Sequence, residues 1–231
     1  MLIDLLFPKR CPVCDRPVRI AEGEICAECR KILRYVVNPY CMKCGKPLGS
    51  AEAEFCYDCT NRKHYFDRGI SLYRYDCIRR TIYRFKYAGR REYADFLGAE
   101  MARRLGPMML AWKPDALIPV PLHTSRLKKR GYNQAGLLAR KVGQMLNIPV
   151  YENWIVREKN TKPLKLLDGR ERQNNLKKAF KIVQNEVKLK TIIIIDDIYT
   201  TGSTVDEISV LCRENGVKKI YFAALSVGNG F

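Results

Sequence analysis

Residues 191–207, TIIIIDDIYTTGSTVDE, join an apolar β-branched run to two aspartates and then to hydroxyl side chains around one glycine. The run 192–195 is typical of a central parallel strand that is buried on both faces. Asp196 and Asp197 follow at the carboxyl end of this strand, and a helix is expected from about Val205. In open α/β sheets, ligands bind beyond the carboxyl ends of the strands. This stretch is therefore expected to form the ligand site.

The segment after the two aspartates has the composition of an anion-binding helix N-terminus. Backbone N–H groups at such an end, with Thr and Ser hydroxyls beside them, bind anions. Gly202 lets the main chain approach a phosphate closely, and carboxylates accept hydrogen bonds from a sugar diol. The expected ligand is a ribose 5-phosphate. The residues expected to hold it are Asp196, Asp197, Thr200, Thr201, Gly202, Ser203 and Thr204.

Two other kinds of site contain similar residues. A nucleotide P-loop requires Gly-x-x-x-x-Gly-Lys-Ser/Thr, and no lysine follows Gly202, so this class is excluded. Paired aspartates at a strand end are also magnesium ligands in phosphotransfer proteins, which carry them early in the domain. A plain capped helix needs neither two acids nor a row of hydroxyls, so we favour the ribose-phosphate interpretation.

Strands and helices are expected to alternate along most of the chain. Further strands are predicted at 66–75, 116–122, 148–156, 177–183 and 218–227. Helical spacing of apolar residues covers 78–105, with a break near Ala88 and Gly89. A basic loop leading into a helix is expected at 122–147, and another helix at 205–215. This alternation predicts an α/β fold in which helices flank a mainly parallel sheet.

Eight of the ten cysteines form four Cys-x-x-Cys pairs, and the last two pairs repeat the first two thirty residues later. Two such pairs complete a closed tetrahedral four-cysteine site, which is the pattern of structural zinc. We assign one zinc ion to Cys11, Cys14, Cys26 and Cys29 and a second to Cys41, Cys44, Cys56 and Cys59. The spacing also allows a cross-braced arrangement, in which the first Cys-x-x-Cys pair (the first knuckle) shares a zinc ion with the third. Cys77 and Cys212 are expected to be buried structural thiols.

The cysteine-containing N-terminal segment is too short and too polar to form a hydrophobic core, so bound zinc is expected to stabilise it instead. Two domains are therefore expected, a double zinc ribbon at 1–62 and an α/β domain at 63–231.

The net charge of +18 is concentrated in the middle of the chain, at residues 61–181. A concentrated positive field attracts polyanions such as nucleic acid or phosphate-rich small molecules, although a solubilising surface has the same composition. No run approaches the roughly 18 apolar residues of a membrane span. The opening residues 1–10 lack the flanks of a signal peptide, so a cytoplasmic protein is expected.

Several motifs in one order carry a resemblance to a known family. Residues 192–204 look like the phosphoribosyl-pyrophosphate (PRPP) binding motif of type I phosphoribosyltransferases, and nearly the whole chain is similar to the competence-protein ComF (ComFC) family. The matching features are the double zinc ribbon after Leu-Leu-Phe-Pro (5–8), Lys-Tyr-Ala-Gly (86–89), Pro-Val-Pro-Leu-His (119–123), Arg126, Arg-Gly-Tyr-Asn-Gln-Ala (130–135), Thr161, Arg172, Asn175 and Ala-Phe (179–180). The resemblance implies a type I phosphoribosyltransferase fold.

The resemblance also implies roles for individual residues. Asp196 and Asp197 hold the ribose hydroxyls, 200–204 holds the 5-phosphate, Mg²⁺ accompanies PRPP, and 157–175 is a loop that closes on the substrate. The residues of the pyrophosphate loop are Leu122, His123, Arg126 and Arg130. The role of His123 is either phosphate contact or structural, and no residue is assigned as catalytic. Where many relatives have Gln, this chain has Leu164, so turnover stays open.

Two functions fit this resemblance. The first is a PRPP-binding protein that handles single-stranded DNA in natural transformation, with a competence helicase or other DNA-processing proteins as partners. The alternative is an active phosphoribosyltransferase whose acceptor base is unknown. The segment 79–87 interleaves cations with aromatic residues, and single strands bind such mixtures, although an amphipathic helix with core aromatics has the same pattern. The predicted DNA contacts are Arg79, Arg80, Arg84 and Lys86.

Overall fold

The central sheet of the computed structural model has four parallel strands in the order β1-β6-β5-β2. These strands are β1 (Arg68–Arg74), β2 (Ala116–Pro119), β5 (Thr191–Tyr199) and β6 (Lys219–Val227). A separate antiparallel pair consists of β3 (Ile155–Arg157) and β4 (Phe180–Ile182). The expected mainly parallel sheet is therefore confirmed. The structure describes residues 9–18, 23–158, 179–183 and 187–228.

The strand β5 lies inside the sheet, and its isoleucines face both layers of the protein. All four residues at 192–195 are 0% exposed. Because successive side chains of a strand point to opposite faces, Ile193 and Ile195 join one hydrophobic cluster, whereas Ile192 and Ile194 join another. The apolar run of β5 is therefore buried on both faces, because helices cover each side of the sheet.

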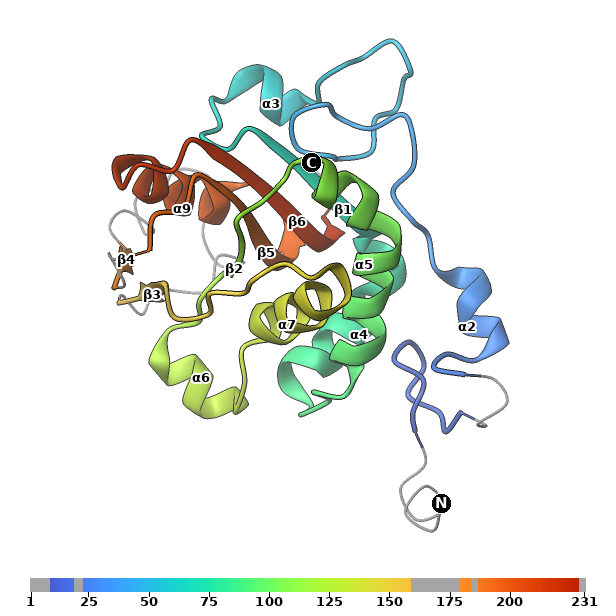
Figure 1. Cartoon of the computed structure of the whole chain (residues 1–231). Helices are drawn as coiled ribbons and strands as arrows, with labels where there is room; N and C mark the ends of the chain where they lie inside the picture. Colours follow the sequence, from blue (N-terminus) through green and yellow to red (C-terminus); the bar gives the residue numbers. More distant parts are fainter. Residues whose placement is uncertain (1–8, 19–22, 159–178, 184–186, 229–231) are drawn as a thin grey trace.

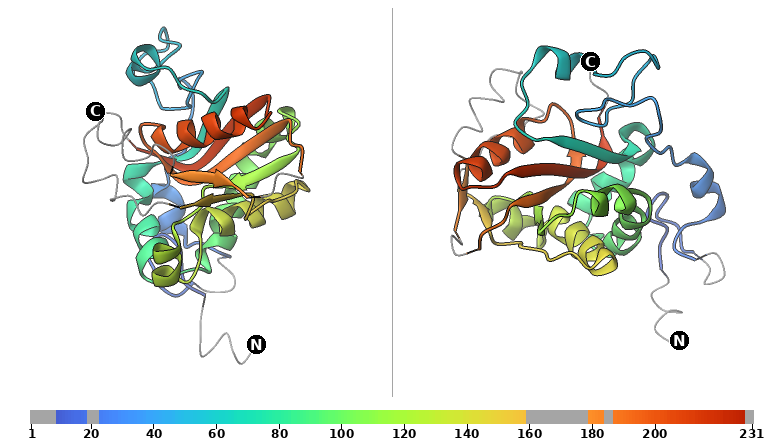
Figure 2. Two further views of the ribbon diagram at one scale, coloured as in Figure 1. Left: turned by 90° about the vertical axis from the view of Figure 1, so that its left-hand side faces the viewer. Right: turned by 45° about the horizontal axis from the view of Figure 1, so that its top comes forward.

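Helices cover both faces of this sheet, as Figures 1 and 2 show. The helices α4 (Tyr75–Tyr87), α5 (Tyr93–Ala111) and α7 (Gln134–Leu146) pack on one face, and α9 (Ser203–Glu214) packs on the other. The short helix α6 (Thr124–Arg130) precedes α7. The carboxyl ends of β2 and β5 therefore point toward α6 and the start of α9.

The N-terminal part contains two knuckle repeats with matching backbone hydrogen bonds. The Asp15 N–H donates to Cys11 O at 2.8 Å, and the Gly45 N–H donates to Cys41 O at 2.9 Å. Asp15 and Gly45 are equivalent left-handed positions, with φ of 66° and 73°. A Cβ at position 45 would lie 2.8 Å from the carbonyl oxygen of Gly69. Glycine is therefore required at this position because the second repeat docks closely on β1.

The first repeat docks on different elements, at α4 and the start of α5. Arg84 Nη1 donates to Val13 O at 3.0 Å, and Arg90 Nη2 lies 3.1 Å from Asp15 Oδ2. The Tyr93 hydroxyl donates to Asp15 Oδ1 at 2.5 Å. The remaining knuckles lead into the short helices α2 (Ala27–Ile32) and α3 (Tyr57–Asn61). The two copies of the repeat therefore support different parts of the α/β core.

The prediction of a strand at 148–156 is wrong over most of that range. Only the part in β3 is a strand, and upstream of it Val150 makes a single bridge to Leu117 of β2. Pro149 has no N–H group to donate to a ladder, which limits pairing here to isolated contacts.

Two boundaries near the expected ligand site also differ from the prediction. Part of the expected basic loop is helix α6, because His123 accepts a cap from the Ser125 N–H and Gly131 ends the helix with a φ of 79°. The helix α9 begins at Ser203 instead of Val205, and β5 continues to Tyr199. The acidic pair therefore lies inside β5, close to its carboxyl end.

Some expected features fall outside the described residues, namely Leu-Leu-Phe-Pro at 5–8, Thr161, Leu164, Arg172 and Asn175. In the described part of the chain, no helix combines the length and apolar character that crossing a membrane requires.

Candidate functional site

A pocket with a volume of 210 Å³ opens at the carboxyl end of β5, next to α6 and the start of α9. All seven residues expected to hold a sugar phosphate line this β5 pocket: Asp196, Asp197, Thr200, Thr201, Gly202, Ser203 and Thr204. From the expected pyrophosphate loop, Leu122, Arg126 and Arg130 also line it. The structure therefore brings the acids, the hydroxyls and the cations together in one cavity.

The two aspartates of the β5 pocket have different surroundings. Asp197 is 7% exposed, and its Oδ2 lies 2.8 Å from Nζ of Lys86 at the end of α4. Burial and the neighbouring Asp197 charge raise the pKa of Asp196 to about 7, against the attraction of Lys86 and Arg157. Asp196 therefore titrates near neutrality.

Three arginines form the basic wall of the β5 pocket. Burial and the nearby Arg126 charge lower the pKa of Arg157 to about 10. Burial and the charge of Arg130 likewise lower the pKa of Arg126. These guanidinium groups repel one another, and a bound anion relieves this repulsion. This wall is therefore suited to a polyanionic group such as pyrophosphate.

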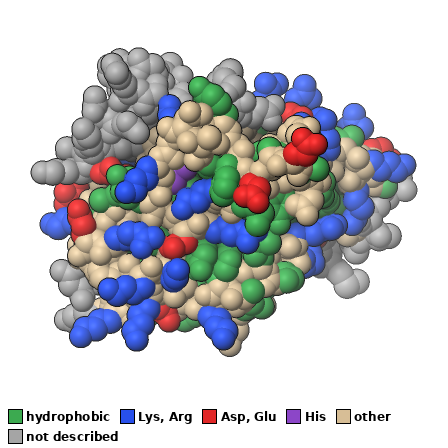
Figure 3. All heavy atoms as spheres, turned by 90° about the horizontal axis from the view of Figure 1, so that it is seen from above, with side chains coloured by type: hydrophobic (Ala, Val, Ile, Leu, Met, Phe, Trp, Pro, Cys, Tyr) green, Lys and Arg blue, Asp and Glu red, His purple; other side chains and the backbone are tan. Residues whose placement is uncertain are grey.

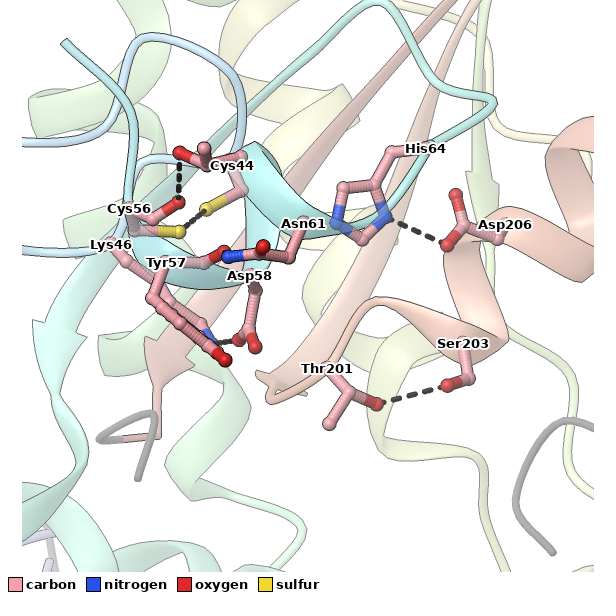
Figure 4. Close-up of polar contacts among 11 residues, drawn as sticks. Cys44, Lys46, Cys56, Tyr57, Asp58, Asn61, His64, Thr201, Ser203 and Asp206 are labelled. Carbon is pink, nitrogen blue, oxygen red and sulfur yellow. Dashed lines mark hydrogen bonds and ion pairs between the residues drawn. The ribbon is translucent and has the colours of Figure 1, made fainter. Parts of the chain in front are cut away.

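The β5–α9 turn, residues 200–204, forms the other end of the pocket. Gly202 has a φ of 80°, and a Cβ there would lie 2.7 Å from Tyr199 Oη. The Thr201 and Ser203 hydroxyl oxygens are 2.9 Å apart, as Figure 4 shows. The turn leads directly into α9, whose first N–H groups have no partner within the helix and attract anions.

His123 lies beside this pocket and not among its lining residues. Its Nδ1 accepts from the Ser125 N–H at 3.2 Å and lies 2.8 Å from Ser125 Oγ. The structure therefore shows His123 as the N-cap of α6.

A second pocket, which we call the α4 groove, has a volume of 460 Å³. It contains all four predicted DNA contacts and is lined by Tyr75, Arg79, Arg80, Ile82, Tyr83, Arg84, Lys86, Tyr87 and Ile198. Tyr83 and Tyr87 are 63% and 60% exposed, and their ring centroids are 5.2 Å apart. Phe85 is instead 0% exposed. The helix is therefore amphipathic, but two of its aromatic rings remain on the outer face.

Two of these cations already have partners. Arg84 holds the first zinc ribbon through Val13 O, and Lys86 pairs with Asp197. Lys86 and Ile198 line both pockets, so the α4 groove and the β5 pocket share a wall. Lys and Arg side chains are also spread over the face drawn in Figure 3, in keeping with the net charge of +18.

The eight paired cysteines gather in two groups, Cys11, Cys14, Cys26 and Cys29 in one and Cys41, Cys44, Cys56 and Cys59 in the other. Within each group the sulfur atoms lie within 4.8 Å of one another. Four ligands about 2.3 Å from a tetrahedral zinc ion are about 3.8 Å apart. The observed sulfur separations of 3.8 Å for Cys14–Cys26 and 3.6 Å for Cys44–Cys56 fit this geometry. The pairing is therefore consecutive, and both groups suit structural zinc.

Sequence reasoning gave no individual role to several residues near the β5 pocket, although Arg157 was the first residue of the loop expected to close on the substrate and is instead the last residue of β3. Asn133 caps α7 and donates to Val120 O at 3.0 Å, and Gln134 accepts from Arg130 at 2.8 Å. Both residues line the pocket, as does Arg157. Asn before an apolar helical run is a recognisable cap signal, whereas the position of Arg157 depends on tertiary contacts.

Comparison with known proteins gives matches over both parts of the chain. Residues 2–60 match the double zinc ribbon domain, and residues 102–229 match the phosphoribosyl transferase domain. The chain is 34% identical over 223 residues to competence protein F of Haemophilus influenzae, covering 93% of this chain and 95% of that protein. It is 30% identical over 225 residues to DNA utilization protein YhgH of Salmonella typhimurium, covering 94% and 96%. Competence protein ComFC of Bacillus subtilis is 31% identical over 139 residues, or 58% of this chain and 53% of that protein.

Proposed function

Because the chain belongs to the competence protein F (ComF) family, with a phosphoribosyl transferase domain and a double zinc ribbon, we propose that it binds PRPP together with Mg²⁺ and handles single-stranded DNA. The names of its relatives, competence protein F and DNA utilization protein, support the DNA part of this proposal. We place the activity in the cytoplasm, with proteins that process incoming DNA as partners. We also propose the domain boundary near residue 62.

The observation that carries the PRPP proposal is the composition of the β5 pocket. It joins two aspartates, an amide-lined turn and a basic wall within one cavity. Asp196 and Asp197 accept from the ribose hydroxyls, the β5–α9 turn binds the 5-phosphate, and the arginines face the pyrophosphate. When bound, Mg²⁺ neutralises pyrophosphate oxygens. In this arrangement the ribose hydroxyls meet hydrogen-bond acceptors, and the phosphate and pyrophosphate groups meet positive charge.

Calorimetric titration tests this proposal directly. PRPP with Mg²⁺ is expected to bind, ribose 5-phosphate to bind more weakly, and ribose alone to give no signal. Repeating the PRPP titration with single-stranded DNA present measures any coupling between the two ligands. A protein that does not bind PRPP contradicts the proposal. Release of pyrophosphate on addition of a nucleobase would show instead that the protein is an active transferase.

The affinity for PRPP is expected to rise between pH 6 and pH 8. The pKa of Asp196 is about 7, so its ionised form, which accepts from the diol, becomes populated over this range. Phosphate groups also titrate near pH 6, so ribose 5-phosphate and 2-deoxyribose 5-phosphate should be compared by the same titration. The deoxy sugar keeps the phosphate and loses one diol hydroxyl, so its pH dependence should be shallower. Equal slopes would exclude Asp196 as the titrating group.

Replacing Arg79 and Arg80 by alanine is expected to weaken binding of single-stranded DNA and to reduce its dependence on salt. Each phosphate contact contributes about 0.7 to the slope of log affinity against log salt, so two lost contacts lower the slope by about 1.4. The Tyr83→Ala change should weaken binding by about 1–3 kcal/mol through lost stacking and leave the slope unchanged. Fluorescence anisotropy at several salt concentrations measures both quantities.

The matched control removes two exposed cations elsewhere, with Arg30→Ala and Lys31→Ala in the last turn of α2. Arg84 is left intact in these variants because it holds the first zinc ribbon. If the control lowers affinity and slope as much as the Arg79 and Arg80 changes do, DNA does not bind in the α4 groove.

A further inference from the structure

The linker at residues 62–67, between the second zinc ribbon and β1, is bound to the first turn of α9. His64 Nδ1 lies 2.8 Å from Asp206 Oδ2, and the Tyr65 N–H donates to Asp206 Oδ1 at 2.9 Å. Because an ionised carboxylate only accepts, Nδ1 carries the hydrogen in the first contact. His64 is 8% exposed. Both carboxylate oxygens of Asp206 are therefore engaged by the linker.

His64 also packs against the β5–α9 turn. A Cβ at Gly202 would lie 3.1 Å from His64 Cε1 and 3.2 Å from Nδ1. Figure 4 shows His64 and Asp206 pointing toward one another beside the turn that carries Thr201 and Ser203. The imidazole therefore supports the turn on the side where glycine leaves space for it.

The second zinc ribbon reaches the same turn by a second route. Lys46 is 5% exposed, and its Nζ lies 2.5 Å from Asp58 Oδ2 and 5.8 Å from the ring centroid of Tyr199. Lys46 follows one knuckle of the second four-cysteine group and Asp58 lies inside another, so this group fixes both. Tyr199 in turn approaches Gly202 through its hydroxyl. The second ribbon therefore reaches the turn through Tyr199, in addition to the contact made by the linker.

We infer that His64 and Asp206 are positioning residues that hold the β5–α9 turn in its anion-binding conformation before the ligand arrives. An unpaired carboxylate in the first turn of α9 would compete with a phosphate for the positive end of the helix. The linker keeps the Asp206 carboxylate bound, so this end stays available to the ligand. A turn that is already ordered also loses less conformational entropy on binding. The inference rests on the proposed PRPP function.

A second set of hydrogen bonds between the linker and α9, which we call the second clip, provides a matched control. Arg213, in the last turn of α9, donates to Tyr65 O at 2.9 Å and to Asp67 Oδ2 at 2.8 Å. This clip lies at the opposite end of α9 from the β5 pocket. The Arg213→Ala change should therefore lower the melting temperature, while the contacts of His64 and Tyr65 with Asp206 keep the linker on the first turn of α9.

The experiment compares the full-length wild type with His64→Ala, His64→Asn and Arg213→Ala, using PRPP calorimetry, zinc content and amide hydrogen exchange without ligand. His64→Ala should lower PRPP affinity about tenfold, or about 1.4 kcal/mol, and speed exchange in residues 200–208 while retaining zinc. His64→Asn keeps a donor near the position of Nδ1 and should restore most of the affinity. Arg213→Ala should change neither the affinity nor the exchange at 200–208.

Two results would overturn the inference. One is a His64→Ala variant with unchanged exchange at 200–208, and the other is an Arg213→Ala variant that loses as much affinity as His64→Ala. Failure of the wild type to bind PRPP is a separate outcome, because it refutes the proposed function. Hydrogen exchange in the unliganded protein still decides whether His64 holds the turn.

Discussion

Replacing Asp196 and Asp197 together by asparagine is expected to lower the affinity for PRPP by about a hundredfold or more. An asparagine oxygen still accepts from a hydroxyl, but a hydrogen bond to a charged group contributes about 1.5–3 kcal/mol against about 0.5–1.5 kcal/mol for a neutral one. Two bonds weakened in this way amount to about two powers of ten. The Asp197 change also leaves Lys86 without its carboxylate partner. Calorimetry with PRPP and Mg²⁺ measures the loss. An affinity within about tenfold of the wild type would show that the sugar does not bind these acids.

The single Asp196→Asn change is expected to stabilise the fold while it weakens binding. Burial raises the pKa of Asp196 from 3.8 to about 7, so the folded protein holds a proton that the unfolded chain releases at lower pH. The stability contributed by this group is present below about pH 4 and is lost as the pH rises to about 7. At pH 8 the neutral amide should therefore raise the apparent melting temperature, by about 2–4 °C for each kcal/mol.

The matched control for both effects is Asp115→Asn, at the opposite end of β5. Asp115 Oδ2 accepts from the N–H groups of Lys190 and Thr191, at 2.7 and 2.8 Å. Losing this contact should lower the melting temperature and leave PRPP affinity unchanged. Asp196→Asn should raise the melting temperature and lower PRPP affinity, whereas Asp115→Asn should lower the melting temperature alone. The comparison therefore distinguishes an effect on ligand binding from a general loss of stability in β5.

Removing zinc is expected to have the largest effect on stability. Structural zinc binds zinc-finger peptides with about 10–16 kcal/mol, and this binding energy is also folding energy. The purified chain should therefore contain two zinc ions, and the Cys29→Ser and Cys59→Ser variants about one each, because each removes one ligand from one group. Elemental analysis together with limited proteolysis measures metal content and local unfolding. A gently purified wild type with one zinc ion or none contradicts two separate sites.

The two zinc variants should also differ in what else they lose. The first ribbon docks on α4 through Arg84, so Cys29→Ser should weaken DNA binding in the α4 groove. The second ribbon and its linker contact Tyr199 and Asp206 on either side of the β5–α9 turn, so Cys59→Ser should weaken PRPP binding. Cys77→Ser and Cys212→Ser serve as controls, because these two cysteines belong to neither group. Both controls should keep two zinc ions.

The elements that sequence reasoning predicted well are those whose signals are continuous along the chain. The apolar run of β5, its two acids and the following hydroxyls are consecutive, so the strand and the helix after it were expected in the right order, although the helix begins two residues earlier than predicted. The cysteine spacing likewise predicted both four-cysteine groups. Helix caps were predicted less well. The His123 cap and Gly131 delimit the short helix α6, where the sequence had predicted a loop.

Contacts that join distant parts of the chain could not be predicted from a single sequence. His64 and Asp206 are 142 positions apart, and neither belongs to a motif. Lys86 was predicted to contact DNA because it lies in a segment of alternating cations and aromatic residues, but the fold brings its amine to Asp197. Arg157 enters the β5 pocket from the end of β3. In each case the residue type is common, and only the tertiary fold gives it a partner.

The equivalent knuckle positions Asp15 and Gly45 show that the two halves of the tandem repeat are no longer exchangeable. Aspartate at the first position anchors its ribbon to Tyr93, whereas the second position has no room for any side chain beside Gly69. A chain in which segments 11–29 and 41–59 trade places would keep every metal ligand and still fail to assemble. The residue at this one position therefore decides which neighbour each copy of the repeat is able to contact.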